Sequence, residues 1–167
     1  MKKISLAYIC IGLFVLMAGC NNRRYYSADP FYSSTGEWDS IRIPLIKPYE
    51  AVSIQGSDSW YINLLELQKT GILYISVPDI QKIAVMNDVI LAYTSYEPDH
   101  SENMGDRVLY WFVIIPSMKI ETGFNNEGNF LKYIQEHGIY DIIWESPDSI
   151  YQRFGKSGCL EWIPGCQ

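Results

Sequence analysis

Cysteine side chains are the residues of this chain whose type and spacing most clearly allow chemistry. The sequence contains four, with Cys10 and Cys20 near the start and Cys159 and Cys166 near the end. The last two would close a loop of eight residues that contains a Pro-Gly pair, which favours reversal of the chain. In an oxidising compartment this spacing predicts a structural disulfide, with free thiols or a redox or metal pair as the alternatives.

The first twenty residues have the pattern of a secretory signal. Lys2 and Lys3 precede an uncharged apolar stretch over residues 4–17, which is too short to cross a hydrocarbon core of about 30 Å. The stretch ends in Ala18-Gly19-Cys20, which resembles the lipobox of bacterial lipoproteins. The resemblance implies cleavage between Gly19 and Cys20 and lipidation of the Cys20 thiol. An ordinary secretory signal or a short membrane anchor is the alternative.

Net charge excludes some classes of partner. Removal of residues 1–19, with Lys2 and Lys3, would leave 148 of the 167 residues and 11 basic against 19 acidic side chains, a net charge of −8. An acidic domain of this kind argues against nucleic acid as a partner. Asn21 and Asn22 follow Cys20, without the aspartate that retains some lipoproteins in the inner membrane. We therefore expect an outer-membrane anchor. No acidic run of the kind that directs some lipoproteins to the cell surface follows Cys20, so we expect the domain to face the periplasm.

The chain after the signal divides into a tether and one domain. Residues 20–37 are rich in Ser, Asn and Pro and show no clear period, so we expect a lipidated Cys20 followed by a flexible tether. Residues 38–167 are expected to form a single globular domain.

Alternating apolar residues predict an α+β fold that is mainly an antiparallel sheet. A hairpin is expected over residues 80–94, because an Asn-Asp pair that tolerates positive φ separates two apolar runs. One main helix is expected over Glu127–His137, packed on the sheet, and a short second helix is expected to begin at Ser146-Pro147-Asp148. Residues 139–144 are expected to add a further strand between these helices.

The order of elements from Ile80 to Ile139 resembles an uncharacterised family of small bacterial lipoproteins, a domain of unknown function. The shared features are an Ile-x-x-Ile-Ala strand at residues 80–84, an Asn-Asp turn, a Tyr-Trp-x-x-Ile strand at residues 110–114, and a helix that contains Phe130. The resemblance implies a β-rich fold and an envelope location, and it supplies no catalytic residues.

Catalytic and metal-binding patterns are absent from the sequence. It contains no Gly-x-Ser-x-Gly, no phosphate-binding loop and no His-Glu-x-x-His. His137 falls at the predicted helix C-terminus, where it serves as a cap. His100 lies among carboxylates in a loop whose spacing does not fit a calcium site, so we expect a solvated loop. We predict no catalytic residues, no metal site and no cofactor.

Aromatic residues are the remaining indication of function. The chain has 13 Tyr and 5 Trp, and exposed aromatic rings are typical of sugar-binding and protein-binding surfaces. Trp60, Trp111 and Trp144 fall in predicted strands and are expected to fill the core. Trp38 and Trp162 flank the domain and are the predicted binding residues.

Together these patterns predict a membrane-anchored lipoprotein of the cell envelope. We expect it not to be an enzyme, and to bind an unidentified protein or a saccharide. The alternatives are an immunity or inhibitor lipoprotein, whose acidic surface would block a toxin, and an envelope hydrolase.

Overall fold

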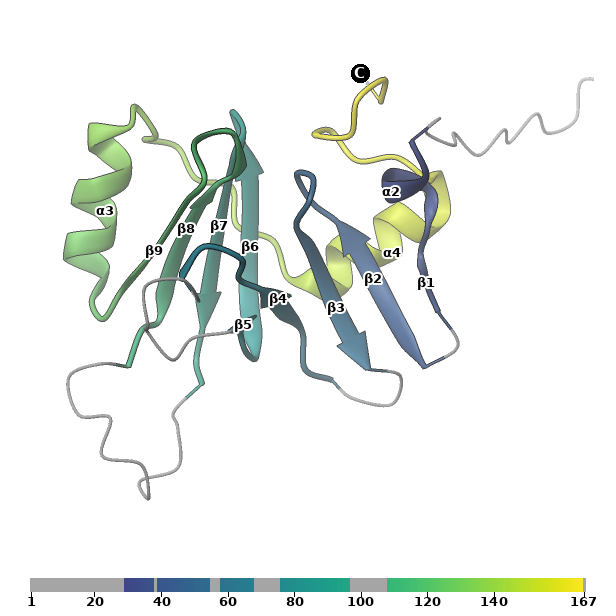
Figure 1. The fold of residues 1–167 in the computed structure, drawn as a ribbon, viewed down its shortest axis with the longest axis horizontal. Coiled ribbons are helices and arrows are strands. Elements are labelled where there is room, and N and C mark those ends of the chain that lie inside the picture. Colours follow the sequence, from purple (N-terminus) through teal and green to yellow (C-terminus); the bar gives the residue numbers. More distant parts are fainter. Residues whose placement is uncertain (1–28, 38, 55–57, 68–75, 97–107, 167) are drawn as a thin grey trace, which may run out of the picture.

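The computed structural model describes residues 29–37, 39–54, 58–67, 76–96 and 108–166 (Figure 1). It confirms an α+β fold that is mainly antiparallel sheet. The described strands form two sheets. The first has the order β1 (Gly36–Glu37), β2 (Ser40–Pro44), β3 (Glu50–Ile54), β4 (Tyr61–Asn63) and β5 (Ser76–Val77). The second has the order β6 (Ile80–Met86), β7 (Val89–Thr94), β8 (Trp111–Ile115) and β9 (Ile120–Phe124).

The hairpin of β6 and β7 forms as the sequence predicts. Met86 pairs with Val89, and Asn87 and Asp88 between them have φ values of 47° and 64°. A two-residue turn with both residues at positive φ matches the twist of the flanking strands, and Asn and Asp tolerate that conformation best after glycine.

The second sheet is buried on both faces (Figure 1). Alternate residues of β7 explain this, because Ile90 and Ala92 lie in the larger core while Val89 and Leu91 lie in a second cluster. The larger core is shared with the first sheet and with α4 (Pro147–Ser157). The second cluster is closed by α3 (Glu127–Glu136).

Both helices begin at the residues that the sequence indicates. The Asn126 side chain accepts from the N–H of Asn129 at the start of α3, and the Ser146 side chain accepts from the N–H of Ser149 at the start of α4. The second helix is not short, however. It has 11 residues against the 10 of α3, and it ends at Gly158, whose φ is 69°.

Residues 139–144 do not form the predicted strand. The backbone of the segment that joins α3 to α4 pairs with the second sheet at an isolated bridge, in which Ile83 and Glu145 exchange hydrogen bonds of 2.8 and 2.9 Å. The apolar side chains of Ile139, Ile142 and Trp144 nevertheless pack in the second cluster. Ile139 is buried, while Tyr140 and Ile143 are 72% and 75% exposed.

The folded region begins before residue 38. A short helix α2 (Pro30–Ser33) and strand β1 both fall within the predicted tether, and the Tyr32 side chain is buried in the larger core. β1 pairs with β2, and the N–H of Arg42 donates to the carbonyl of Thr35 at 3.0 Å. The prediction of a tether up to residue 37 is therefore wrong for residues 29–37, because their aromatic side chains find apolar surface to cover. Residues 20–28 lie outside the described residues.

Candidate functional site

A small pocket lies on the outer face of the first sheet, between the segment of α2 and β1 and the strands β2 and β3. Its volume is about 330 Å³. Antiparallel strands place alternate residues on one face, so Ser40 and Arg42 of β2 share the pocket side with Glu50 and Val52 of β3. The N-terminal segment completes the lining, which consists of Phe31, Ser34, Gly36, Ser40, Arg42, Glu50 and Val52.

Arg42 is the central side chain of this pocket. One of its terminal nitrogens donates to the carbonyl oxygens of Phe31 and Ser34 at 2.9 and 3.2 Å. Its Nε lies 2.5 Å from Oε2 of Glu50, and the guanidinium lies 4.9 Å from the centroid of the Phe31 ring. The Arg42 side chain is only 12% exposed. Arg42 therefore joins the N-terminal segment to the sheet, and its charge is balanced within the pocket.

Asp29 fixes the start of α2 at the edge of the pocket. Its carboxylate accepts from the backbone N–H of Phe31 at 2.9 Å and from Nζ of Lys47 at 2.9 Å. The hydrogen bond from Lys47, followed by that from Phe31, lowers the pKa of Asp29 below its ordinary value of 3.8. The ionised form of Asp29 thus holds α2 against the turn between β2 and β3.

Two serines are among the residues that line the pocket. Within the described part of the chain, neither the Ser34 nor the Ser40 side chain has a hydrogen-bond partner. The second carboxylate oxygen of Glu50 also has no hydrogen bond to a described residue, and the Glu50 side chain is 37% exposed. The pocket therefore presents donors and acceptors to a molecule from solution.

A second polar cluster joins the two sheets. The carboxylate of Glu121, on β9, accepts from the backbone N–H groups of Leu65, Glu66 and Leu67 at 2.6–2.8 Å and from the Tyr49 hydroxyl at 2.7 Å. Burial, and then the hydrogen bond to Glu121, raise the pKa of Tyr49. Tyr49 therefore stays protonated and donates. All four donors come from the protein itself, so we assign this cluster, the Glu121 clamp, to stability.

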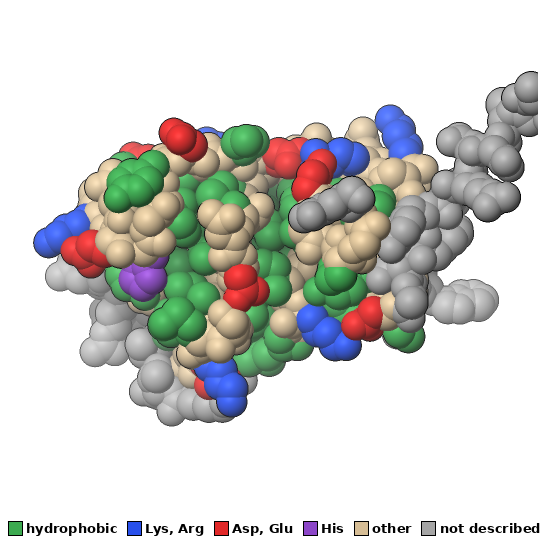
Figure 2. All heavy atoms as spheres, turned by 90° about the horizontal axis from the view of Figure 1, so that it is seen from above, with side chains coloured by type: hydrophobic (Ala, Val, Ile, Leu, Met, Phe, Trp, Pro, Cys, Tyr) green, Lys and Arg blue, Asp and Glu red, His purple; other side chains and the backbone are tan. Residues whose placement is uncertain are grey.

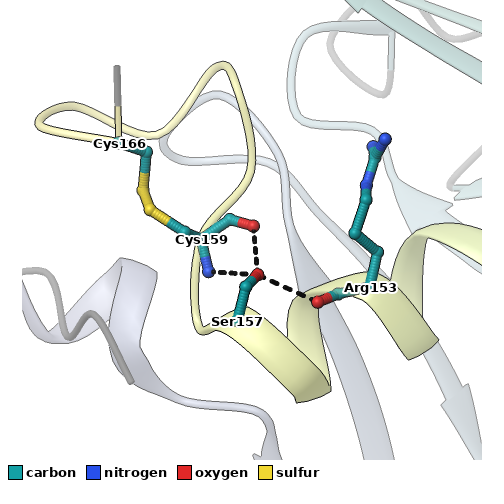
Figure 3. Close-up of a disulfide and its surroundings, with 4 residues drawn as sticks. All are labelled: Arg153, Ser157, Cys159 and Cys166. Carbon is teal, nitrogen blue, oxygen red and sulfur yellow. Dashed lines mark hydrogen bonds between the residues drawn. A yellow bond between two sulfur atoms is a disulfide. The ribbon is translucent and has the colours of Figure 1, made fainter. Parts of the chain in front are cut away.

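The predicted disulfide between Cys159 and Cys166 is confirmed. The Sγ atoms are 2.02 Å apart and the Cα atoms 5.6 Å apart. Figure 3 shows how the loop leaves α4: the Ser157 hydroxyl accepts from the N–H of Cys159 at 3.0 Å, and its one proton is shared between the carbonyl oxygens of Arg153 at 2.9 Å and Cys159 at 2.7 Å. The polar groups at the base of the loop are thereby satisfied, which agrees with a structural disulfide.

The two predicted binding tryptophans have different outcomes. Trp162 is half-buried against the larger core, and its Nε1 donates to the carbonyl of Pro44 at 3.0 Å. It holds the disulfide loop on β2 and does not line the pocket. Trp38 lies outside the described residues, as do Gly19, Cys20 and His100.

Other side chains singled out in the sequence have structural partners. His137 ends α3, and its Nδ1 lies 2.9 Å from the carbonyl oxygen of Tyr133. Glu145 pairs with Arg153 at 3.0 Å, and Asp148 accepts from Nε1 of Trp60 at 2.9 Å. Trp60 is buried as predicted, whereas Trp111 and Trp144 are half-buried against the second cluster.

The described residues contain no group of three or more His, Cys, Asp or Glu side chains placed to hold a metal ion. None of the helices in these ranges is long and apolar enough to cross a membrane.

Figure 2 shows hydrophobic side chains over much of the face seen from above, interrupted by single carboxylates. The large apolar side chains that are most exposed in the described chain, Tyr140 and Ile143, belong to the segment between α3 and α4.

Comparison with known proteins gives no relative. No family model, no curated protein and no solved structure matches this chain. The resemblance of residues 80–139 to a lipoprotein family therefore stays a prediction.

The sequence did not indicate the pocket. In the sequence, Arg42 and Glu50 have the pattern of polar residues in alternating strands. Phe31 and Ser34 fall in the segment that was predicted to be a tether. Only the spacing of two residues between Ser40 and Arg42, and between Glu50 and Val52, could have suggested a shared face.

Proposed function

We propose that this protein is a lipid-anchored binding protein of the bacterial cell envelope, without catalytic activity. Cys20 would carry the lipid after cleavage at Gly19, and the pocket under α2 would hold the ligand. The outer membrane, with the domain on the periplasmic side, is the location that the residues after Cys20 favour.

The pocket with its balanced Arg42–Glu50 pair is the observation that carries the binding role. Three of its polar groups have no partner in the described chain, and the Glu50 carboxylate is already paired with the Arg42 guanidinium at 2.5 Å. A binding site suits this chemistry better than a catalytic one.

The position of the pocket supports its link to the membrane. Phe31 and Ser34 line the pocket, and Asp29 begins the described chain. Asp29 follows Cys20 by nine positions, and a chain of this length spans at most about 30 Å when fully extended. A lipid on Cys20 would therefore keep the pocket near the bilayer surface.

Two measurements test the two parts of this proposal. Palmitate labelling of intact cells should mark the wild-type protein and leave a Cys20→Ala variant unlabelled in the same fractions; equal labelling of both would refute the anchor. A photo-crosslinking amino acid at Ser40 should give an adduct in cells, while the same group at the exposed Ser149 of α4 should not. Equal adducts from both positions, or none, would refute the pocket as the binding site.

A further inference from the structure

The polar groups of the pocket point to one chemical class of ligand. We propose that the pocket binds one neutral sugar ring, whose hydroxyl groups bridge Glu50 and the hydroxyls of Ser34 and Ser40. This inference rests on the binding role proposed above and names its ligand.

Charge balance excludes ionic ligands. The Arg42 guanidinium is already paired with the Glu50 carboxylate at 2.5 Å, so the pocket holds no unpaired charge that an anion or a cation would satisfy. The protein is also acidic, with a net charge of −6 for the full chain, and this disfavours an anionic ligand further. A ligand that fits must offer hydrogen bonds without a net charge.

The polar groups of the pocket that have no partner in the described chain include both hydrogen-bond donors and acceptors. The Glu50 oxygen that does not face Arg42 can only accept, whereas the hydroxyls of Ser34 and Ser40 can both donate and accept. Adjacent sugar hydroxyls have the same dual capacity, so each can donate to Glu50 and accept from a serine. Hydrogen bonds to the ionised Glu50 would be the stronger ones.

Size and apolar lining agree with a single ring. The volume of about 330 Å³ lies at the small end of ligand sites, which range over about 300–1,000 Å³. Phe31 and Val52 add apolar surface beside the polar groups, and Gly36 lets the backbone of β1 approach β2 closely at the pocket wall. Its φ is 139°, and a Cβ there would lie 2.2 Å from the carbonyl oxygen of Ser40, so no larger residue fits. A sugar ring presents C–H groups to apolar walls and hydroxyls to polar ones.

The experiment uses the mature protein in a detergent whose headgroup contains no sugar. Saturation-transfer NMR is recorded with glucose, galactose and N-acetylglucosamine, and with glucuronic acid and glucosamine as charged counterparts. At least one neutral sugar should give a signal that exceeds those of the charged pair. Stronger binding of a charged sugar, or no signal from any neutral one, would overturn the inference.

Substitutions in the pocket test whether the sugar binds there. Glu50→Gln should weaken binding about tenfold, and Ser40→Ala about threefold, because they remove a charged and a neutral hydrogen bond. Ser149→Ala is the matched control on α4 and should bind as the wild type does. Circular dichroism checks that each variant is folded, and Ser40→Ala removes no side-chain hydrogen bond within the described chain. Unchanged affinity in both pocket variants would overturn the inference.

The result separates this inference from the proposed function. If Ser40 crosslinks to a protein in cells and no sugar binds, the binding role stands and the sugar is refuted. If the Cys20→Ala variant is labelled like the wild type, the anchor fails, while the sugar measurement on the purified protein is unaffected.

Discussion

Replacement of Glu121 with alanine would remove the acceptor of the clamp that joins the two sheets. Four donors would lose their partner, namely the N–H groups of Leu65, Glu66 and Leu67 and the Tyr49 hydroxyl. The Leu65 N–H is exposed, so water would replace the carboxylate there. The other three bonds are partly buried, and each would be lost or replaced by a poorer one.

The expected loss of stability follows from these three bonds. A hydrogen bond to a charged group contributes about 1.5–3 kcal/mol, and partial exposure reduces this to about 1 kcal/mol each. Glu121→Ala should therefore lower the free energy of unfolding by about 3 kcal/mol. Glu121→Gln keeps one acceptor oxygen, but its amide NH2 group would face backbone N–H donors. We expect it to lower the free energy of unfolding by about half as much as Glu121→Ala. Tyr49→Phe removes one donor and should cost about 1 kcal/mol.

Urea unfolding followed by tryptophan fluorescence measures these differences. With a slope of about 1.5 kcal/mol per molar, within the usual range, Glu121→Ala should shift the midpoint by about 2 M. Glu136→Ala is the matched control, because this exposed residue of α3 makes no side-chain contact in the described chain, and it should stay within about 0.5 kcal/mol of the wild type. A loss below 0.5 kcal/mol for Glu121→Ala would refute the clamp as a stabilising contact.

Three further predictions concern the ends of the domain and its core. Cys159→Ser, which opens the disulfide to Cys166, should cost about 2.5 kcal/mol from the entropy of a loop of eight residues, and an unchanged urea midpoint would contradict this. The lowered pKa of Asp29 means that its contact with Lys47 is present above pH 3.8 and is lost as the pH falls through the lower folded value; NMR titration should give a midpoint below 3.8 that rises in Lys47→Ala. Phe154→Ala, at a side chain that is 1% exposed, should cost about 3–5 kcal/mol by thermal or urea unfolding, and a loss under 1 kcal/mol would place this residue outside the core.

Local signals in the sequence predicted local structure well. The Asn87-Asp88 turn and the helix starts at Asn126 and Ser146 all depend on contacts within a few residues, so the sequence contains the necessary information. The disulfide was also predictable, because Cys159 and Cys166 lie seven positions apart and have no nearer partner.

Contacts between distant segments could not be predicted from these patterns. The Glu121 clamp joins residues 54–72 positions apart, and nothing in the sequence around Glu121 marks it as an acceptor of three backbone N–H groups. The division into two sheets has the same cause, since each strand alternates in the same way whichever sheet it joins. The run of apolar residues at 139–144 resembled a strand, although in this segment only Glu145 pairs with β6.

The sequence did not predict the pocket, because one side of it is formed by residues 29–37, which were predicted to be a tether. The composition of residues 29–37 is that of a linker, but Tyr32 reaches the core and Arg42 binds the carbonyl oxygens of Phe31 and Ser34. These contacts depend on the position of β2, which the composition of the segment does not reveal.

The most direct test of the proposed lipid-anchored protein is the intact mass of the protein extracted from bacterial membranes. We predict a chain that begins at Cys20, carries the mass of its attached lipid, and is two hydrogens lighter than the sum of its residues because Cys159 and Cys166 are joined. A chain that retains residues 1–19, or one that begins at Cys20 without added lipid, would contradict the proposal.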